Sequence, residues 1–196
     1  MPDPVVARFE QTVPHLPHLP HESTGDVFHD LVSCLVEQQI HYRSTKHVFA
    51  RALDRAGLGR VTPDTFGEFE RDGLADVRLS RQKRDALAAT VAFFETHHDI
   101  DWAALSDAEV RTLLKQIRGV GPWTIDMVLL YTLERPNIFP ADDYHLKQIM
   151  GTLYGIEPGN GQKRRMKDMA EAWRPERSRA VRLLLAWKAW QRERAR

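Results

Sequence analysis

Helical periodicity runs along nearly the whole chain after residue 26. Apolar side chains recur three and four positions apart, and glycines, prolines and capping residues interrupt them about every 10 to 20 residues. No alternating run of apolar and polar residues is long enough to predict a strand. We therefore expect an all-α fold with two helical lobes and a cleft between them. The predicted helices are Val27 to Ile40, Ser44 to Ala56, Pro63 to Asp72, Arg81 to His97, Asp107 to Ile117, Pro122 to Leu133, Asp142 to Tyr154, Gln162 to Trp173 and Glu176 to Arg194.

Length and composition limit the class of protein. A chain of 196 residues with 42% apolar content suits one large domain or two small lobes. The single cysteine, Cys34, excludes an internal disulfide and a four-cysteine metal or iron-sulfur cluster. No signal peptide or bilayer-length apolar stretch is visible, so a cytoplasmic protein without a membrane partner is expected.

Residues 1–25 form a Pro- and His-rich N-terminal arm, and residues 26–196 are predicted to form the helical domain. The arm contains the repeat HLPHLPH, in which proline prevents a regular helix. Three histidines alone, without carboxylates or thiols beside them, are a weak metal signal. A flexible or surface-wrapping arm is the expected structure.

Net charge is +1 overall but is divided unevenly along the chain. Residues 162–196 carry 12 Lys or Arg and 4 Asp or Glu, which gives +8; residues 1–161 carry 16 and 23, which gives −7. A basic tail of this kind can hold a polyanion. Taken by itself, however, such a tail is more often a solvated helix face.

A Gly-x-Gly turn interrupts the apolar pattern at Gly119-Val120-Gly121. Ser106 and Glu109 have capping-box spacing and start the preceding helix. Gly119 can close that helix in a left-handed conformation, and Gly121 removes a side chain where the next helix begins.

Backbone amides at the start of the second helix can bind a phosphate, with the Thr124 hydroxyl beside them. Pro122 fits the first turn because it lacks an N–H. The same residues also fit a plain corner between two helices, and both interpretations stand at this point.

Two carboxylates, Asp142 and Asp143, open the next helix in the run PADDYHLKQ. On a helix they point about 100° apart, so they cannot have the same role. Both are residue types that cap or solvate helix starts.

The run IRGVGPWTIDMVLLYTL and the later IFPADDYHLKQ resemble the helix-hairpin-helix and catalytic helix of the DNA glycosylase superfamily. PADDYHLKQ is most similar to the 3-methyladenine DNA glycosylase II group, which removes alkylated bases. LVEQQIHYRSTKHVFARAL resembles the family's QQ helix, and LSRQKRDALAATVAFF its SxxK helix. The resemblance covers about Val27 to Trp190, and the chain is too short for the N-terminal β domain of longer members.

The resemblance implies a base-excision repair enzyme that hydrolyses the N-glycosidic bond of 3-methyladenine and 7-methylguanine in duplex DNA. Asp143 matches the catalytic carboxylate, and Asp142 is then expected to cap the helix. Bifunctional members carry a lysine two residues after the second hairpin glycine, where this chain has Trp123. A monofunctional enzyme without lyase activity is therefore expected.

The resemblance also assigns the other site residues. Trp123 walls the base pocket, although it also fits a core anchor of the hairpin. The remaining expected pocket residues are Tyr144, Met127 and Trp187. Met127 lies where the family often has an aromatic residue. The C-terminal aromatic residue of the family falls near Leu185, and Trp187 follows two residues later. Expected DNA contacts are Gly119, Gly121, Thr124, Lys147 and Gln39, which matches the residue that fills the gap left by the flipped base.

The main-chain carbonyls of Lys115, Ile117 and Gly119 match a monovalent cation site of the family. No organic cofactor or catalytic metal is expected. Double-stranded DNA is the expected partner, bound by a monomer in the nucleoid.

Three alternatives remain. A noncatalytic helix-hairpin-helix DNA-binding module would not need Asp143. An adenine or oxidised-base glycosylase usually has an iron-sulfur cluster or the hairpin lysine, and this sequence has neither. An unrelated helical hydrolase is the third.

Overall fold

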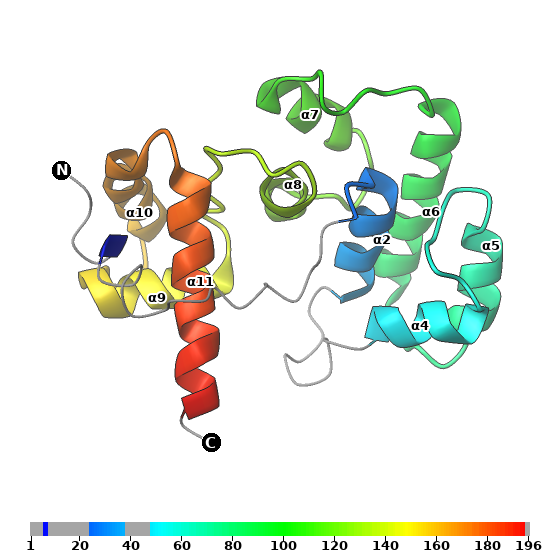
Figure 1. Ribbon diagram of the computed structural model, residues 1–196, viewed down its shortest axis with the longest axis horizontal. Coiled ribbons are helices and arrows are strands. Elements are labelled where there is room, and N and C mark those ends of the chain that lie inside the picture. The colour runs from blue at the N-terminus through cyan, green and yellow to red at the C-terminus, as the bar shows by residue number, and fades with distance from the viewer. Residues whose placement is uncertain (1–5, 8–23, 38–47, 195–196) are drawn as a thin grey trace. The chain divides into compact units, whose positions relative to one another are not determined.

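The computed structural model describes residues 6–7, 24–37 and 48–194, with side chains as far as Lys188. Every regular element in these ranges is a helix, which confirms the predicted all-α class (Figure 1). The chain divides into two compact units. We call Ser23–Leu133 the hairpin unit and Glu134–Arg196 the carboxylate unit, and describe each by itself.

The hairpin unit contains most of the helices. They are α2 (Val27–Glu37), α4 (Val48–Ala56), α5 (Phe66–Glu68), η1 (Phe69–Gly73), α6 (Arg81–Thr96), α7 (Asp107–Leu114), α8 (Pro122–Met127) and η2 (Val128–Thr132).

Helix α2 forms the centre of this unit's core, because it contacts α4, α6, α8 and η2. Its Leu31 and Val32 side chains are fully buried. Phe28 meets Phe66 and Phe94 edge-on, with ring centroids 6.5 and 5.2 Å apart. Burying such side chains stabilises the fold by about 1.5–3 kcal/mol each, so α2 connects the outer helices to the hairpin.

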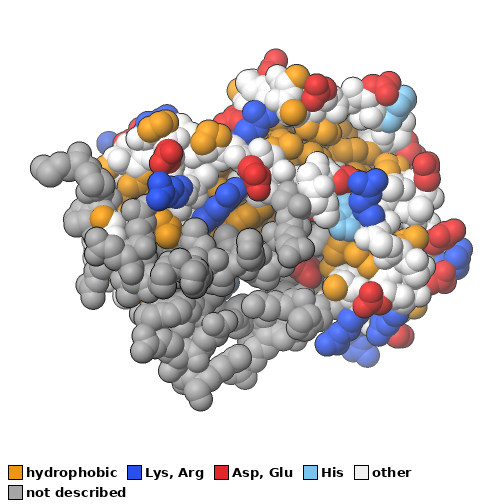
Figure 2. All heavy atoms as spheres, viewed as in Figure 1, with side chains coloured by type: hydrophobic (Ala, Val, Ile, Leu, Met, Phe, Trp, Pro, Cys, Tyr) orange, Lys and Arg blue, Asp and Glu red, His pale blue; other side chains and the backbone are white. Residues whose placement is uncertain are grey.

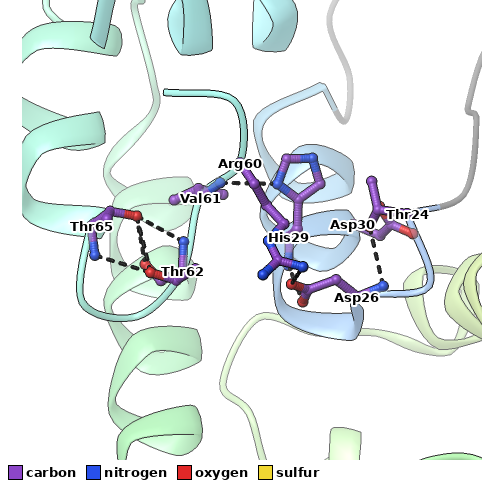
Figure 3. A network of polar contacts seen from close by, with 8 residues as sticks. All are labelled: Thr24, Asp26, His29, Asp30, Arg60, Val61, Thr62 and Thr65. Carbon is purple, nitrogen blue, oxygen red and sulfur yellow. Dashed lines mark hydrogen bonds and ion pairs between the residues drawn. The ribbon is translucent and has the colours of Figure 1, made fainter. Parts of the chain in front are cut away.

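A polar network fixes the start of α2 (Figure 3). The Asp26 carboxylate accepts a hydrogen bond from the His29 amide at 3.1 Å and pairs with Arg60 at 3.3 Å. The Thr24 hydroxyl accepts from the Asp26 amide, and His29 Nδ1 accepts from the Val61 amide at 3.1 Å. Burial lowers the pKa of His29. The neutral ring, with its proton on Nε2, suits this acceptor role.

The other end of α2 carries a half-buried ionisable pair. Lys83 of α6 donates from Nζ to the Val36 carbonyl at 2.8 Å, and so satisfies a carbonyl in the last turn of α2. Burial raises the pKa of Glu37 to about 7, while the Phe49 backbone and the Lys83 charge act in the opposite direction. Burial also lowers the pKa of Lys83.

The carboxylate unit contains α9 (Tyr144–Tyr154), α10 (Gln162–Ala170), η3 (Glu171–Trp173) and α11 (Arg177–Arg194). Helix α9 contacts both α10 and α11. Leu146, Met150, Met166 and Leu184 are fully buried between these helices. Helix α9 ends at Tyr154, as predicted, and Gly155 with a φ of 64° closes its last turn.

Several predicted helix limits are wrong. The helices expected over 63–72 and 122–133 contain π segments, in which Leu74 donates to Phe69 and Leu133 to Val128, five residues back. Helix α7 ends at Leu114 rather than at residue 117. The spacing of apolar residues does not predict the π segments, because a turn with one extra residue still keeps the apolar side chains on one buried face of the helix.

Within the described ranges, each helix is too short or too polar to cross a membrane.

We predict that Glu37→Gln removes a pH dependence of stability. The folded state binds the Glu37 proton more tightly than the unfolded chain does. The free energy that this proton adds to the stability of the folded state is therefore fully present below about pH 4.5 and is lost as the pH rises through about 7. Urea unfolding between about pH 5 and pH 8 should show wild type losing stability relative to the variant. A stability difference between wild type and variant that stays constant with pH contradicts this prediction. Glu95→Gln, at an exposed site on α6, is the control.

Candidate functional site

The hairpin begins with the predicted capping box. The Ser106 hydroxyl accepts from the Glu109 amide at 3.3 Å, and Glu109 Oε2 accepts from the Ser106 amide at 2.8 Å. The Ser106 hydroxyl also donates to Glu109 Oε2 at 2.6 Å, and this bond, together with the one from the Ser106 amide, lowers the pKa of Glu109. The start of α7 is therefore fixed by its own sequence.

Gly119 turns the chain between α7 and α8. Its φ is +91°, and a Cβ placed there would lie 2.5 Å from the Ala86 Cβ on α6. Ala86 is itself buried. Gly119 is therefore required both by the turn and by close packing of the turn against α6.

Gly121 is in a different environment from Gly119. It caps α8 with φ −97° and ψ 173°, an extended conformation that any residue adopts. A Cβ there would have no atom of the described residues within 4 Å. The part of the chain that the structure describes therefore gives no steric reason for a glycine at position 121.

An ion pair joins the two hairpin helices. Arg111 of α7 donates from Nη2 to Asp126 Oδ1 of α8 at 2.6 Å, and Asp126 is only 7% exposed. Loss of Arg111 would remove the positive charge that pairs with a largely buried carboxylate, which costs stability. The ion pair therefore holds α7 and α8 in a fixed orientation. We did not predict it from the sequence.

The predicted hairpin site residues divide by exposure. Trp123 and Met127 are both half-buried and lie four residues apart in α8, so they share one helix face. Thr124 is only 2% exposed, and its hydroxyl is therefore poorly placed to reach a DNA phosphate. Gln39 lies outside the described residues.

The carbonyls proposed for a cation belong to the segment between α7 and α8. Ile117 O accepts the Val120 amide at 3.1 Å, which occupies one of its two lone pairs. The other lone pair stays available, so this hydrogen bond leaves room for a cation at Ile117 O. Among the described side chains, no group of three or more His, Cys, Asp or Glu is arranged to hold a metal.

Asp143 is the N-cap of α9. It is 7% exposed, and its Oδ1 accepts the Leu146 amide at 2.7 Å. Its own amide donates to the Pro140 carbonyl at 2.9 Å. The expectation that Asp142 caps this helix is therefore wrong, because Asp143 is the cap and the helix begins at Tyr144, two residues after its predicted start.

Asp142 instead forms ion pairs with lysines. Its carboxylate lies 2.5 Å from Lys163 Nζ of α10 and 3.7 Å from Lys147 Nζ of α9. The Lys163 hydrogen bond, aided by the charges of Lys147 and Lys167, lowers the pKa of Asp142. Lys147, a predicted DNA contact, therefore already has an acidic neighbour.

A polar network, which we did not predict, follows Asp143 along α9. Tyr144 is 65% exposed, and its hydroxyl accepts from Gln148 Nε2 at 2.7 Å. Lys188 of α11 donates to Gln148 Oε1 at 2.6 Å and lies 3.2 Å from His145 Nδ1. The four-residue spacing of Tyr144 and Gln148 is a sequence signal for the first contact, but the Lys188 contacts have none. The pocket candidate Trp187 is half-buried on α11.

The predicted site residues therefore form two groups. Gly119, Gly121, Trp123, Thr124 and Met127 lie together in the hairpin unit. Asp143, Tyr144, Lys147 and Trp187 lie on α9 and α11 of the carboxylate unit.

Much of the basic tail is paired with acidic side chains. Arg164 lies 3.9 Å from Asp168, and Arg174 lies 2.5 Å from Glu171. Basic and acidic side chains are intermixed on the face drawn in Figure 2. For these residues the solvated-face interpretation fits better than a continuous polyanion site.

Comparison with known families gives one match over most of the chain. Residues 32–175 match the model of the HhH-GPD superfamily base excision DNA repair protein. The chain belongs to this superfamily.

Curated HhH-GPD relatives carry glycosylase names. The chain is 27% identical over 178 residues to YfjP of Bacillus subtilis, provisionally named a DNA-3-methyladenine glycosylase, covering 83% of this chain and 58% of that protein. It is also 27% identical over 126 residues to DNA-3-methyladenine glycosylase 1 of Schizosaccharomyces pombe, covering 61% of this chain and 54% of that protein. The chain thus spans little more than half the length of these two relatives.

Solved HhH-GPD structures share the fold. The S. pombe 3-methyladenine DNA glycosylase Mag1, solved in complex with abasic DNA, matches with TM-score 0.77 and 22% identity over 91% of this chain and 88% of that one. A DNA-3-methyladenine glycosidase from Bacillus halodurans matches with TM-score 0.71 and 23% identity over 95% and 84% of the two chains.

We predict that the two hairpin glycines differ in their effect on stability. Gly119→Ala should destabilise the protein by about 2–4 kcal/mol, because it combines a left-handed backbone with a clash against Ala86. Gly121→Ala should stay within about 0.5 kcal/mol of wild type, because its position is open. Urea unfolding measures both, and equal losses would contradict the distinction.

Proposed function

We propose that this chain is a monofunctional DNA glycosylase that releases N-alkylated purines, such as 3-methyladenine and 7-methylguanine, from duplex DNA. Membership of the HhH-GPD superfamily and the glycosylase names of its relatives support the class of reaction. The observation that carries the proposal is the carboxylate of Asp143, largely buried at the start of α9 after the hairpin.

Asp143 would stabilise the charge that develops on the sugar. When the bond between C1′ and the base nitrogen breaks, the base leaves with the electron pair and the deoxyribose becomes positively charged. A carboxylate held in a mostly dry position interacts strongly with such a charge. Water then forms the new bond to C1′ and loses a proton, to the Asp143 carboxylate or to solvent.

Trp123 supports hydrolysis without strand cleavage. It occupies the position that holds a Schiff-base lysine in bifunctional members, and an indole cannot form that bond. Its ring can instead bind the cationic face of an alkylated purine. That cationic base leaves as a neutral molecule, so little acid catalysis is needed.

We propose that Trp123, Met127, Tyr144 and Trp187 line the pocket for the flipped base, and that Gln39 fills the gap left in the duplex. Half-burial of Trp123 and Met127 and the exposure of Tyr144 suit surfaces that a base can contact. The substrate would be double-stranded DNA of the nucleoid, bound by a monomer, with no organic cofactor.

The DNA backbone would approach the hairpin at Gly121, where no atom of the described residues occupies the space of a side chain. Gly119 forms the turn that presents this backbone, and Lys147, whose Nζ lies 3.7 Å from Asp142, adds positive charge on α9. A monovalent cation on the carbonyls of Lys115, Ile117 and Gly119 would stiffen the turn.

Asp143→Asn is the decisive variant. Asparagine retains a side-chain oxygen for the Leu146 amide, so the cap survives while the charge is lost. We expect release of methylated bases from duplex DNA, measured by chromatography in single turnover, to fall by about 100-fold or more.

Asp142→Asn is the matched control, since the neighbouring carboxylate pairs with surface lysines. Its rate should stay within about threefold of wild type. Wild type that binds DNA but releases no base would favour the noncatalytic module, and full activity of Asp143→Asn would exclude the mechanism. Strand breaks formed without alkali, or a borohydride-trapped adduct, would contradict the absence of lyase activity.

Gly121→Ala should weaken DNA binding without loss of stability. A methyl group there would obstruct a phosphate held by backbone amides, so affinity for an abasic-analogue duplex should fall about tenfold at fixed salt. Gly59→Ala is the control, because Gly59 is exposed and, like Gly121, has no atom of the described residues within 4 Å of its missing Cβ. Unchanged binding by Gly121→Ala would place the DNA elsewhere.

A further inference from the structure

We propose that the first residues of α11, Arg177 and Ser178, are positioning residues for Asp143. They hold the far end of the segment 135–143, here called the Asp143 loop, through contacts about 40 residues away in sequence. The catalytic meaning of this clamp rests on the proposed function, whereas the clamp itself is a property of the fold.

Ser178 is bonded to the Asp143 loop at three points. Its hydroxyl accepts from the Ile138 amide at 2.9 Å and donates to the Arg135 carbonyl at 2.5 Å. Its own amide donates to the Pro136 carbonyl at 3.0 Å. Ser178 is 4% exposed and Ile138 is 2% exposed, so little water is present to replace these bonds.

Arg177 holds the same loop with its guanidinium. Nε donates to Asn137 Oδ1 at 2.7 Å, and Nη2 donates to the Asn137 carbonyl at 2.9 Å. Nη1 lies 3.3 Å from Glu171 at the corner between η3 and α11. The planar fork therefore ties the loop to that corner, a geometry that a lysine cannot reproduce.

The rest of the loop transmits this restraint to Asp143. Phe139 is buried and packs edge-on against Trp173, with ring centroids 5.8 Å apart. The Ala141 amide donates to the Phe139 carbonyl at 2.9 Å, and the Asp143 amide donates to the Pro140 carbonyl at 2.9 Å. Successive turns leave few free torsions between the clamp and the carboxylate.

Asp143 needs this support because it lies outside the regular helix. Its ψ of 125° is extended, and although its carbonyl accepts the first helical bond, from the Lys147 amide at 3.0 Å, the loop sets the direction from which the chain enters the helix at Asp143. A misplacement of about 1 Å at a reacting group can cost about 100-fold in rate.

Two variants test the clamp. Ser178→Ala removes both hydroxyl bonds, and Arg177→Lys keeps the charge near Glu171 while losing the fork to Asn137. Arg174→Ala is the matched control, because Arg174 also pairs with Glu171 and is half-exposed.

The first measurement is hydrogen exchange of the Leu146 amide, which reports its bond to Asp143 whether or not the chain is catalytic. The second is single-turnover release of methylated base, with DNA affinity measured alongside. We expect about tenfold faster exchange and about tenfold slower release for Ser178→Ala and Arg177→Lys, with affinity and the control unchanged.

In the Asp143→Asn background, Ser178→Ala should no longer slow release, since it acts through that carboxylate. Unchanged Leu146 exchange in the folded variants, or the same change in Arg174→Ala, overturns the inference. If Ser178→Ala does not fold, the Leu146 exchange rate and the base-release rate of Arg177→Lys test the inference instead. If exchange rises but wild type releases no base, the proposed function fails and the clamp stands.

Discussion

The burial of the Asp143 carboxylate is the constraint around which the carboxylate unit is organised. A carboxylate that is 7% exposed must be supplied with hydrogen-bond donors, and the Leu146 amide in the first turn of α9 is one. This requirement places Asp143 at the N-cap and moves Asp142 out to the lysines. It also makes the loop before α9, and whatever holds that loop, part of the geometry of the site.

The hairpin unit meets a different constraint with its two glycines. Gly119 is demanded by its left-handed turn and by contact with Ala86, so it belongs to the architecture of the fold. Among the described residues no atom crowds Gly121, and we propose that its missing side chain makes room for a DNA backbone. The motif would then combine a folding requirement at Gly119 with a binding requirement at Gly121, which the two substitutions separate.

Local sequence signals predicted local structure well. The Ser106 capping box, the start of α6 at Arg81 and the end of α9 at Tyr154 are confirmed, because each depends on neighbours within a few residues. The error at Asp142 has a simple cause: two adjacent carboxylates both suit a cap, and only packing decides which is used. Contacts such as Ser178 with Ile138 join residues far apart in sequence, and no pattern in one sequence reports them. The assignments of Gln39, the pocket residues and the 25/26 domain limit remain predictions.

The most direct test of the account is a crystal structure of Asp143→Asn bound to a duplex that carries an alkylated purine. We expect the flipped nucleotide to place its C1′ within about 4 Å of the side chain at position 143, with a phosphate at the backbone of Gly121. If the side chain at position 143 lies far from the sugar and the base stays stacked, Asp143 has no part in the reaction.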